Sequence, residues 1–223
     1  MKKILILCVF VGFCIQYSFS QSNHQKVELS SIPKNISWVN TPLNWNVSGN
    51  TLSINAGRGS RLFIDPQRLS QANSAPMALF KPDETFLFSC KVSGNFRSVF
   101  DAAVLMVYGN NNQWAKLCLE YSPQYKPMVV SVVTNQFSDD SNHETISREE
   151  VYLRIAGLGN GAYAFHYSLD GRYWNMVRYF YLNPNNDLKI GFLSQSPKGE
   201  SFNGVFTDIQ YTVRKLNNIR NGE

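Results

Sequence analysis

Three side chains with chemical capacity lie at alternate positions in the segment 113–121, QWAKLCLEY. This segment has the alternation of a β-strand, in which successive side chains point to opposite faces. Trp114, Lys116 and Glu120 therefore share one face with Cys118. A buried sheet would not place an indole, an ammonium group and a carboxylate in one row, so we expect this face to line a groove.

Two later strands carry side chains of the same kinds. Arg154 lies in the segment 151–156, and Trp174 and Arg178 share one face of the segment 173–181. A sugar site needs a flat aromatic ring for the C–H face of a pyranose and charged or amide groups for its hydroxyls. The six residues predict a carbohydrate-binding face, although their charges could equally pair with one another across a solvated sheet.

Cleavage of a glycosidic bond requires two carboxyl groups about 5 to 10 Å apart. The candidates are Glu120, as proton donor or nucleophile, with Asp101 or Asp139 as its partner. No single strand carries a closely spaced acidic set, which favours binding over cleavage. No cofactor is predicted, because the sequence has neither a glycine-rich phosphate loop before a helix nor histidines at zinc-ligand spacing; a calcium ion in the Asp139 loop stays open.

Short strands separated by Gly, Asn and Asp turns fill the chain, and no window has the apolar spacing of a helix. Segment 101–120 forms a hairpin around the Gly109–Asn112 turn, and Asp170-Gly171 marks another. The segments 67–82 and 135–149 are expected to be loops. The pattern predicts an all-β fold of two packed antiparallel sheets, a sandwich or jelly roll.

The first 20 residues have two lysines, an apolar run and small residues before Gln21, which is typical of a secretory signal peptide and too short for a membrane span. We expect a secreted or periplasmic protein with a flexible leader over 21–35, one domain over 36–214 and a polar tail over 215–223. Cleavage would leave 203 residues with a net charge of +3, because only Lys2 and Lys3 are charged in the removed part. No basic run suits nucleic acid.

Cys90 and Cys118 are the cysteines that would remain after cleavage. An oxidising compartment would permit a disulfide between them. The alternation of their strands, however, places Cys90 with Phe86 and Phe88 and places Cys118 on the Trp114 face. We therefore expect two small buried free thiols.

Several motifs occur in the order of a known family: FDAAVLMV, QWAKLCLEY, VVSVVTNQFSDDS, VYLRIAG, YSLDGRYWNMVRYF, IGFLSQSP and SFNGVFTDI. From about residue 36 to 214 the chain resembles the concanavalin A-like domain family of unknown function typified by the yeast regulation-of-enolase protein. The resemblance implies a concanavalin A-like jelly-roll sandwich whose concave sheet handles sugars.

By position, the resemblance assigns the family's characteristic residues to nine positions of this chain. They are an acidic residue at Asp101, the Trp, Lys and Glu of the return strand at Trp114, Lys116 and Glu120, a Ser-Asp pair at Ser138 and Asp139, and a later Arg, Trp and Arg at Arg154, Trp174 and Arg178. The chain departs from the family pattern at Ala102, Val104 and Asp140, where a Gln, a Gly and a Trp are common. Three hypotheses follow: glycan binding on the concave face, a glycoside hydrolase or lyase that uses Glu120, and a protein-interaction module without a small ligand.

Overall fold

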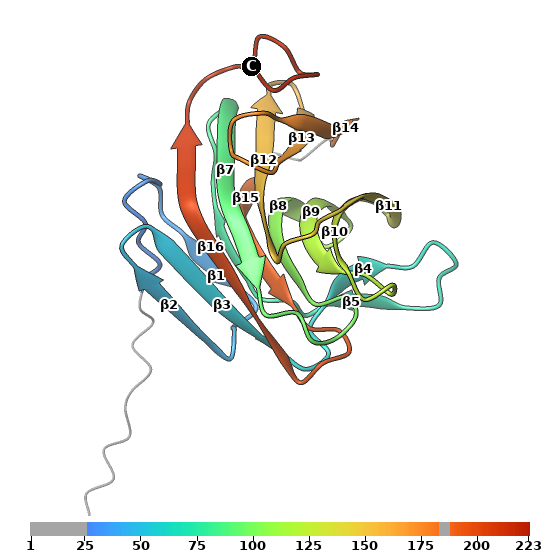
Figure 1. Ribbon diagram of the computed structural model, residues 1–223. Helices are drawn as coiled ribbons and strands as arrows, with labels where there is room; N and C mark the ends of the chain where they lie inside the picture. Colours follow the sequence, from blue (N-terminus) through green and yellow to red (C-terminus); the bar gives the residue numbers. More distant parts are fainter. Residues whose placement is uncertain (1–25, 183–187) are drawn as a thin grey trace, which may run out of the picture.

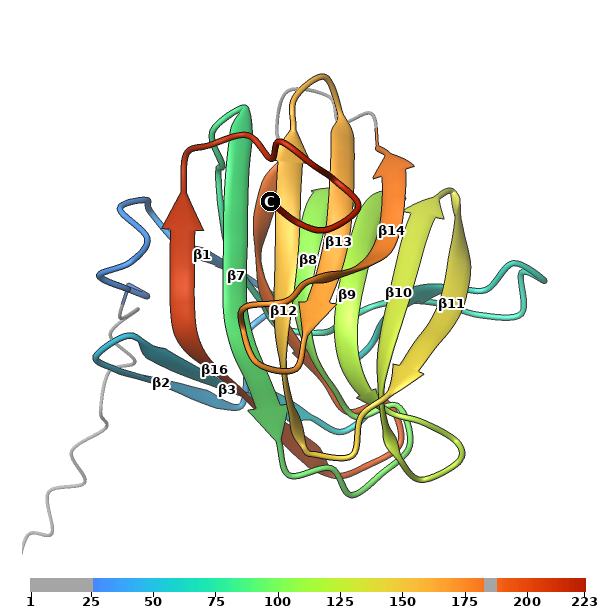
Figure 2. The ribbon, with the colours of Figure 1, turned by 45° about the horizontal axis from the view of Figure 1, so that its top comes forward.

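The computed structural model describes residues 26–182 and 188–223, and every regular element in this part of the chain is a β-strand. Two seven-stranded antiparallel sheets stack on one another (Figures 1 and 2). Sheet I has the order β1 (Ser37–Val39), β6 (Met77–Phe80), β15 (Lys189–Gln195), β8 (Ala102–Asn110), β9 (Gln113–Tyr121), β10 (Pro127–Asn135) and β11 (Phe137–Thr145). Sheet II has the order β14 (Asn175–Tyr181), β13 (Ala162–Ser168), β12 (Glu150–Leu158), β7 (Thr85–Gly94), β16 (Ser201–Thr212), β3 (Thr51–Gly57) and β2 (Asn44–Ser48).

The main core lies between these two sheets and is built by the expected alternation. On β9 the side chains of Ala115, Leu117 and Leu119 face sheet II and are fully buried. Phe192 of β15 connects the layers, because its ring centroid lies 5.1 Å from that of Phe88 and 4.9 Å from that of Phe206. The prediction of an all-β sandwich of two antiparallel sheets is confirmed.

A second, smaller core lies on the outer face of sheet I, beneath a short hairpin of β4 (Leu62–Ile64) and β5 (Gln71–Asn73). Figure 1 shows this hairpin beside β10 and β11. Leu62 and Ile64 of the hairpin pack against Met106, Trp114 and the neighbouring strands of sheet I. The indole of Trp114 is 0% exposed. The expectation that Trp114 lines an open groove is therefore wrong, because the hairpin covers it.

Two segments expected to be loops contain strands. Segment 67–82 contains β5 and β6, and all of Met77–Phe80 is buried because β6 lies between the main core and the second core. Its apolar residues therefore do not alternate with polar ones. Segment 135–149 contains β11, an edge strand whose polar side chains meet solvent while its backbone pairs with β10. Because nearly all of its residues are polar, the sequence pattern predicted neither that this segment is a strand nor how it pairs with β10.

The ends of the described chain pack more closely than expected. Residues 1–25, which include the predicted signal peptide and the first part of the predicted leader, lie outside the described residues. From residue 26 onward the predicted leader differs from expectation, since Val27, Leu29 and Ile32 are buried in the main core. Leu216 of the predicted tail is buried against the outer face of sheet II. No helix long and apolar enough to cross a membrane occurs among the described residues.

The two cysteines of the described chain are buried and unpaired, as expected. Cys90 belongs to the main core between the sheets, whereas Cys118 belongs to the second core. Burial raises the pKa of both thiols, which keeps them protonated and unreactive.

Replacing the indole beneath the hairpin tests whether it is structural. We expect Trp114→Ala to lower the free energy of unfolding by about 3 to 5 kcal/mol, because it leaves a large cavity in the second core. Tyr173→Ala is the matched control, since Tyr173 is 80% exposed and its loss is expected to change stability by less than about 0.5 kcal/mol. Urea denaturation of both variants measures the difference, and equal costs would contradict the buried role of Trp114.

Candidate ligand pocket

A pocket of about 310 Å³ opens on the outer face of sheet I, beside the hairpin that covers Trp114. We call it the Lys116 pocket. Its polar side chains come from four parts of the chain, and its apolar lining includes aromatic rings at Phe63 and Phe100. Its charged and amide side chains are Arg61, Lys116, Glu120, Asp140, Gln195 and Lys198.

Lys116 forms the buried end of this pocket and is only 3% exposed. Its Nζ donates to the Leu62 carbonyl oxygen at 2.8 Å and to Gln195 Oε1 at 3.4 Å. The same nitrogen lies 5.5 Å from the Trp114 ring centroid, within the range of a cation–π contact. One ammonium group thus links the hairpin, strand β9 and the end of strand β15.

Two carboxyl groups line the pocket with Lys116. Glu120 lies on the same face of β9, and Asp140 lies in the row Lys116–Val132–Asp140 across β9, β10 and β11. Burial raises the pKa of Glu120 to about 7; Lys116 opposes this shift and Asp140 adds to it. Burial also raises the pKa of Asp140, again against the influence of Lys116. A lining carboxyl group with a strongly raised pKa is a frequent mark of a functional site.

The rim of the pocket is held by a buried network around Asp101. Ser196 Oγ donates to Asp101 Oδ1 at 2.9 Å, and the backbone nitrogen of Ser98 donates to Asp101 Oδ2 at 3.0 Å. Gln195 Nε2 donates to the carbonyl oxygen of Phe100 at 3.1 Å. Asp101 thereby joins the two turns that carry Phe100 and Gln195 to the pocket.

The backbone of Phe100 shows that this rim is under strain. Its φ of 71° lies in the left-handed region, which a bulky side chain adopts at a cost of about 1 to 3 kcal/mol. The Phe100 nitrogen donates to the Tyr121 carbonyl oxygen at 2.7 Å, so both backbone polar groups of Phe100 are held. The hydrogen bonds therefore fix a conformation that this residue would otherwise avoid.

Neither predicted carboxylate partner of Glu120 reaches the pocket. Asp101 is 0% exposed and its oxygens are taken by Ser196 and the backbone. Asp139 lies on the face of β11 opposite to Asp140, where Arg178 Nη2 lies 3.3 Å from its Oδ1. The predicted pairing of Glu120 with Asp101 or Asp139 therefore does not fit this geometry. The acidic residue that lines the pocket together with Glu120 is Asp140.

The remaining predicted binding residues lie elsewhere. Arg154 and Trp174 lie on the outer face of sheet II, where the guanidinium carbon is 3.5 Å from the indole centroid. Arg154 Nη1 donates to the Gly222 carbonyl oxygen at 2.6 Å. Figure 2 shows the red C-terminal segment crossing β12 and β13 at this place. The expectation of one groove lined by all six residues is therefore wrong: Lys116 and Glu120 line one pocket, and Arg154, Trp174 and Arg178 do not join them.

Sequence reasoning missed several residues of the pocket. Asp140 would have been found if segment 137–145 had been treated as a strand, because alternation then separates it from Asp139. Gln195 lies in the motif IGFLSQSP, but the order of motifs along the chain does not show which residues it contacts in the folded protein. Arg61 and Lys198 lie far apart in the sequence and outside regular strands, so no periodicity connects them.

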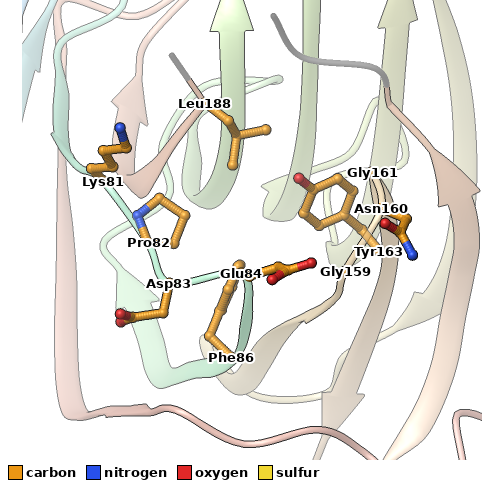
Figure 3. A pocket seen from close by; sticks show the side chains of 10 residues that line it. All are labelled: Lys81, Pro82, Asp83, Glu84, Phe86, Gly159, Asn160, Gly161, Tyr163 and Leu188. Carbon is orange, nitrogen blue, oxygen red and sulfur yellow. The ribbon is translucent and has the colours of Figure 1, made fainter. Parts of the chain in front are cut away.

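A second hollow of about 350 Å³ lies at one end of the sandwich, next to the turn 159–161 (Figure 3). The Asp83 carboxylate is already engaged: Lys34 Nζ lies 2.8 Å from Oδ2 and Tyr211 Oη donates to the same atom at 2.6 Å. In Figure 3 it points away from Tyr163 and Leu188, whereas Glu84 points toward Gly159. This hollow thus lacks the convergent charged groups that the Lys116 pocket has.

The geometry around Asp139 gives no support to a calcium ion. Arg178 pairs with the Asp139 carboxylate, and within residues 26–182 and 188–223 no group of three or more His, Cys, Asp or Glu side chains is arranged to hold a metal. His143, in the same strand, shares a hydrogen bond of 3.0 Å with Ser131 Oγ.

The fold is that of a concanavalin A-like β-sandwich, and comparisons with known proteins place the chain in a family. Residues 38–214 match the family described as "Protein of unknown function (DUF1349)". The chain belongs to this family. Among curated proteins, none matches the sequence.

Solved structures share the fold. A functionally unknown protein from Saccharomyces cerevisiae is 20% identical, with a TM-score of 0.75, over 81% of this chain and 97% of that one. The GH43 protein BlXynB from Bacillus licheniformis, a K247S mutant, is 14% identical, with a TM-score of 0.61, over 79% of this chain and 36% of that one. The xylan beta-1,4-xylosidase from Bacillus halodurans is 13% identical, with a TM-score of 0.59, over 74% of this chain and 33% of that one.

These identities establish likeness of fold alone. This chain spans about a third of the length of the two Bacillus proteins, so their activities belong to proteins that are much longer than the shared sandwich.

A pair of aspartate substitutions tests the structural role of Asp101. We expect Asp101→Asn to lower the free energy of unfolding by about 1 to 3 kcal/mol, because an amide cannot accept the hydrogen bonds of both Ser196 and the 97–98 backbone. Asp139→Asn is the control, with an expected loss of about 0 to 1 kcal/mol, since the Asp139 side chain is 76% exposed. Chemical denaturation measures both, and a negligible effect of Asp101→Asn would contradict the rim network.

The raised pKa of Glu120 predicts a specific pH dependence. Its pKa moves from 4.5 to about 7 on folding, so between these values the native state holds more protons than the unfolded chain. The free energy of unfolding should then fall as pH rises from about 4.5 to 7. We expect Glu120→Gln to remove this contribution and to stabilise the protein above pH 7. Urea midpoints across this range, with carbon-13 NMR titration of the Glu120 carboxyl, measure it; a Glu120 titration near 4.5 would refute the burial argument.

Proposed function

We propose that this is a secreted domain that binds carbohydrate, and that the Lys116 pocket is its binding site. The observation that carries the proposal is the convergence in one hollow of Lys116, Glu120, Asp140 and Gln195, with aromatic rings at Phe63 and Phe100. A sugar presents hydroxyls that both donate and accept, together with apolar C–H faces, so this mixture of groups suits it.

The size and shape of the pocket support a short length of sugar chain. A hollow of about 310 Å³ lies near the lower end of the range for small-molecule sites, roughly 300 to 1,000 Å³. The second core beneath hairpin β4–β5 and the Asp101 network hold its walls before any ligand arrives. A preorganised site loses less conformational entropy on binding. The solved GH43 proteins and the xylosidase share the fold, which is compatible with a role in sugar recognition.

Secretion rests on the first 20 residues, whose pattern is that of a signal peptide. A domain exported from the cell meets polysaccharides of its surroundings, which agrees with the proposed ligand class. Fractionation of cells that express the full chain, with mass analysis of the exported N-terminus, tests this part separately from the binding.

One observation favours cleavage as a second candidate function. Glu120 and Asp140 line the same pocket, and the raised pKa of Glu120 would let it carry a proton near neutral pH. A protonated carboxyl beside a second carboxyl is the arrangement that glycoside hydrolysis uses. Binding remains the first proposal, because it requires only the convergence of groups and not a defined distance between the two carboxyls.

Glycan-array screening followed by calorimetry tests the binding proposal. We expect Glu120→Ala to weaken binding of any captured oligosaccharide by roughly tenfold or more, since the hydrogen bonds of the Glu120 carboxyl group contribute about 1 to 3 kcal/mol in its neutral and charged forms. Glu84→Ala is the matched control, because Glu84 lines the hollow of Figure 3 and not the Lys116 pocket. Equal losses in the two variants, or no captured glycan, would overturn the proposal.

Incubation with the captured oligosaccharide separates binding from cleavage. If the domain cleaves, new reducing ends or unsaturated sugar products appear, and Glu120→Gln abolishes them while binding persists. If it only binds, the wild-type protein releases no product. Capture of a protein partner without any glycan would instead favour an interaction module.

A further inference from the structure

Lys116 is a buried cation that faces the pocket without a carboxylate in contact. Its three N–H donors have two acceptors in the protein, the Leu62 carbonyl oxygen at 2.8 Å and Gln195 Oε1 at 3.4 Å. Both acceptors are uncharged. Within the described residues no carboxylate lies within ion-pair distance of Lys116. Burial of an ammonium group is costly unless an anion compensates it.

Two further cations line the same pocket from separate turns. Arg61 precedes β4, and Lys198 follows β15. Neither has a carboxylate at ion-pair distance among the residues that the structure describes. Exposed cations without such a partner are common among the described residues, so the distinguishing feature of this pocket is that one of its three cations, Lys116, is buried. A buried cation with two further cations lining the same hollow, none of them at ion-pair distance from a carboxylate of the described residues, indicates an anionic occupant.

The acidic groups of the pocket reduce this positive charge but do not cancel it. Glu120 and Asp140 are the carboxyl groups that line it, against the three cations. Because the pKa of Glu120 is raised to about 7, this side chain is only partly ionised at neutral pH, and its protonated form is a hydrogen-bond donor. An acidic ligand therefore meets an excess of cations and of donors.

We propose that the ligand of the Lys116 pocket is an acidic sugar, with its anionic group near Lys116, Arg61 and Lys198 and its ring against Phe63 or Phe100. This inference rests on the proposed carbohydrate binding and adds the ligand's charge. The anionic group is a carboxylate, as in a hexuronate, or a sulfate ester. Either one supplies a charged acceptor in contact with Lys116, whereas a neutral sugar leaves this ammonium group with uncharged acceptors and only the more distant carboxyl groups of Glu120 and Asp140.

Calorimetry of the full chain with matched probes tests the charge requirement. The probes are oligomers of galacturonate, glucuronate and mannuronate, each beside its methyl ester, and sulfated galactan oligosaccharides, each beside its desulfated form. We expect at least one acidic probe to bind tenfold or more tightly than its neutral counterpart, and the pair that shows the difference identifies carboxylate or sulfate.

Substitutions connect this preference to the pocket. Arg61→Gln with Lys198→Gln is expected to reduce the preference for the acidic probe at least fivefold, and Lys116→Met is expected to remove it. The double variant of Arg61 and Lys198 stays informative if Lys116→Met does not fold, because Arg61 is only half-buried and Lys198 is exposed. Thermal denaturation reports the fold of each variant. Lys81→Gln is the control, since Lys81 lines the other hollow (Figure 3) and should leave the preference unchanged.

The outcomes separate this inference from the proposed function. Binding of neutral and acidic probes with equal affinity would overturn the inference and leave carbohydrate binding in place. The inference would also be overturned if Lys81→Gln reduced the preference for the acidic probe as much as the Arg61 and Lys198 substitutions do. The preference would then depend on the net charge of the protein and not on the pocket. Failure of every sugar, acidic or neutral, to bind would overturn the proposed function itself.

Discussion

The contact between the Lys116 ammonium group and the Leu62 carbonyl oxygen is the constraint on which the site depends. It fixes hairpin β4–β5 on the outer face of sheet I, and the second core around Trp114 supplies the apolar packing beneath the hairpin. A sheet with a bare outer face would offer a broad open surface. With the hairpin in place, the same face becomes a packed core at one end and a pocket that opens to solvent at the other.

The polar network at the rim complements this packing. Asp101 and Gln195 are neighbours of Phe100 and Ser196 in sequence, and their hydrogen bonds join two turns that the chain brings together from distant positions. Buried hydrogen bonds of this kind specify a single arrangement, because any other leaves polar groups unsatisfied. The left-handed backbone of Phe100 persists because both of its backbone groups are held.

The Lys116 pocket differs from the rest of the described surface in its buried charge. Opposite charges meet at a few places on the described surface, as between Arg178 and Asp139, and exposed ion pairs contribute little to stability. In the Lys116 pocket a buried cation has only uncharged hydrogen-bond acceptors, and the carboxyl groups that line the pocket have raised pKa values. Burial of these groups is costly to stability, and costs of this kind are typical of sites that bind a ligand.

By itself the sequence determined the all-β fold, the hairpin around the Gly109–Asn112 turn, the two faces of β9 and the separation of Cys90 from Cys118, because alternation and turn chemistry are local. Only the tertiary structure decided what covers each face. Alternation groups Trp114 with Lys116 and Glu120, yet hairpin 62–73 buries the indole and leaves Glu120 at an opening, while the C-terminal segment covers Arg154. Such coverage depends on contacts between segments that lie far apart in the chain, and no local pattern encodes it.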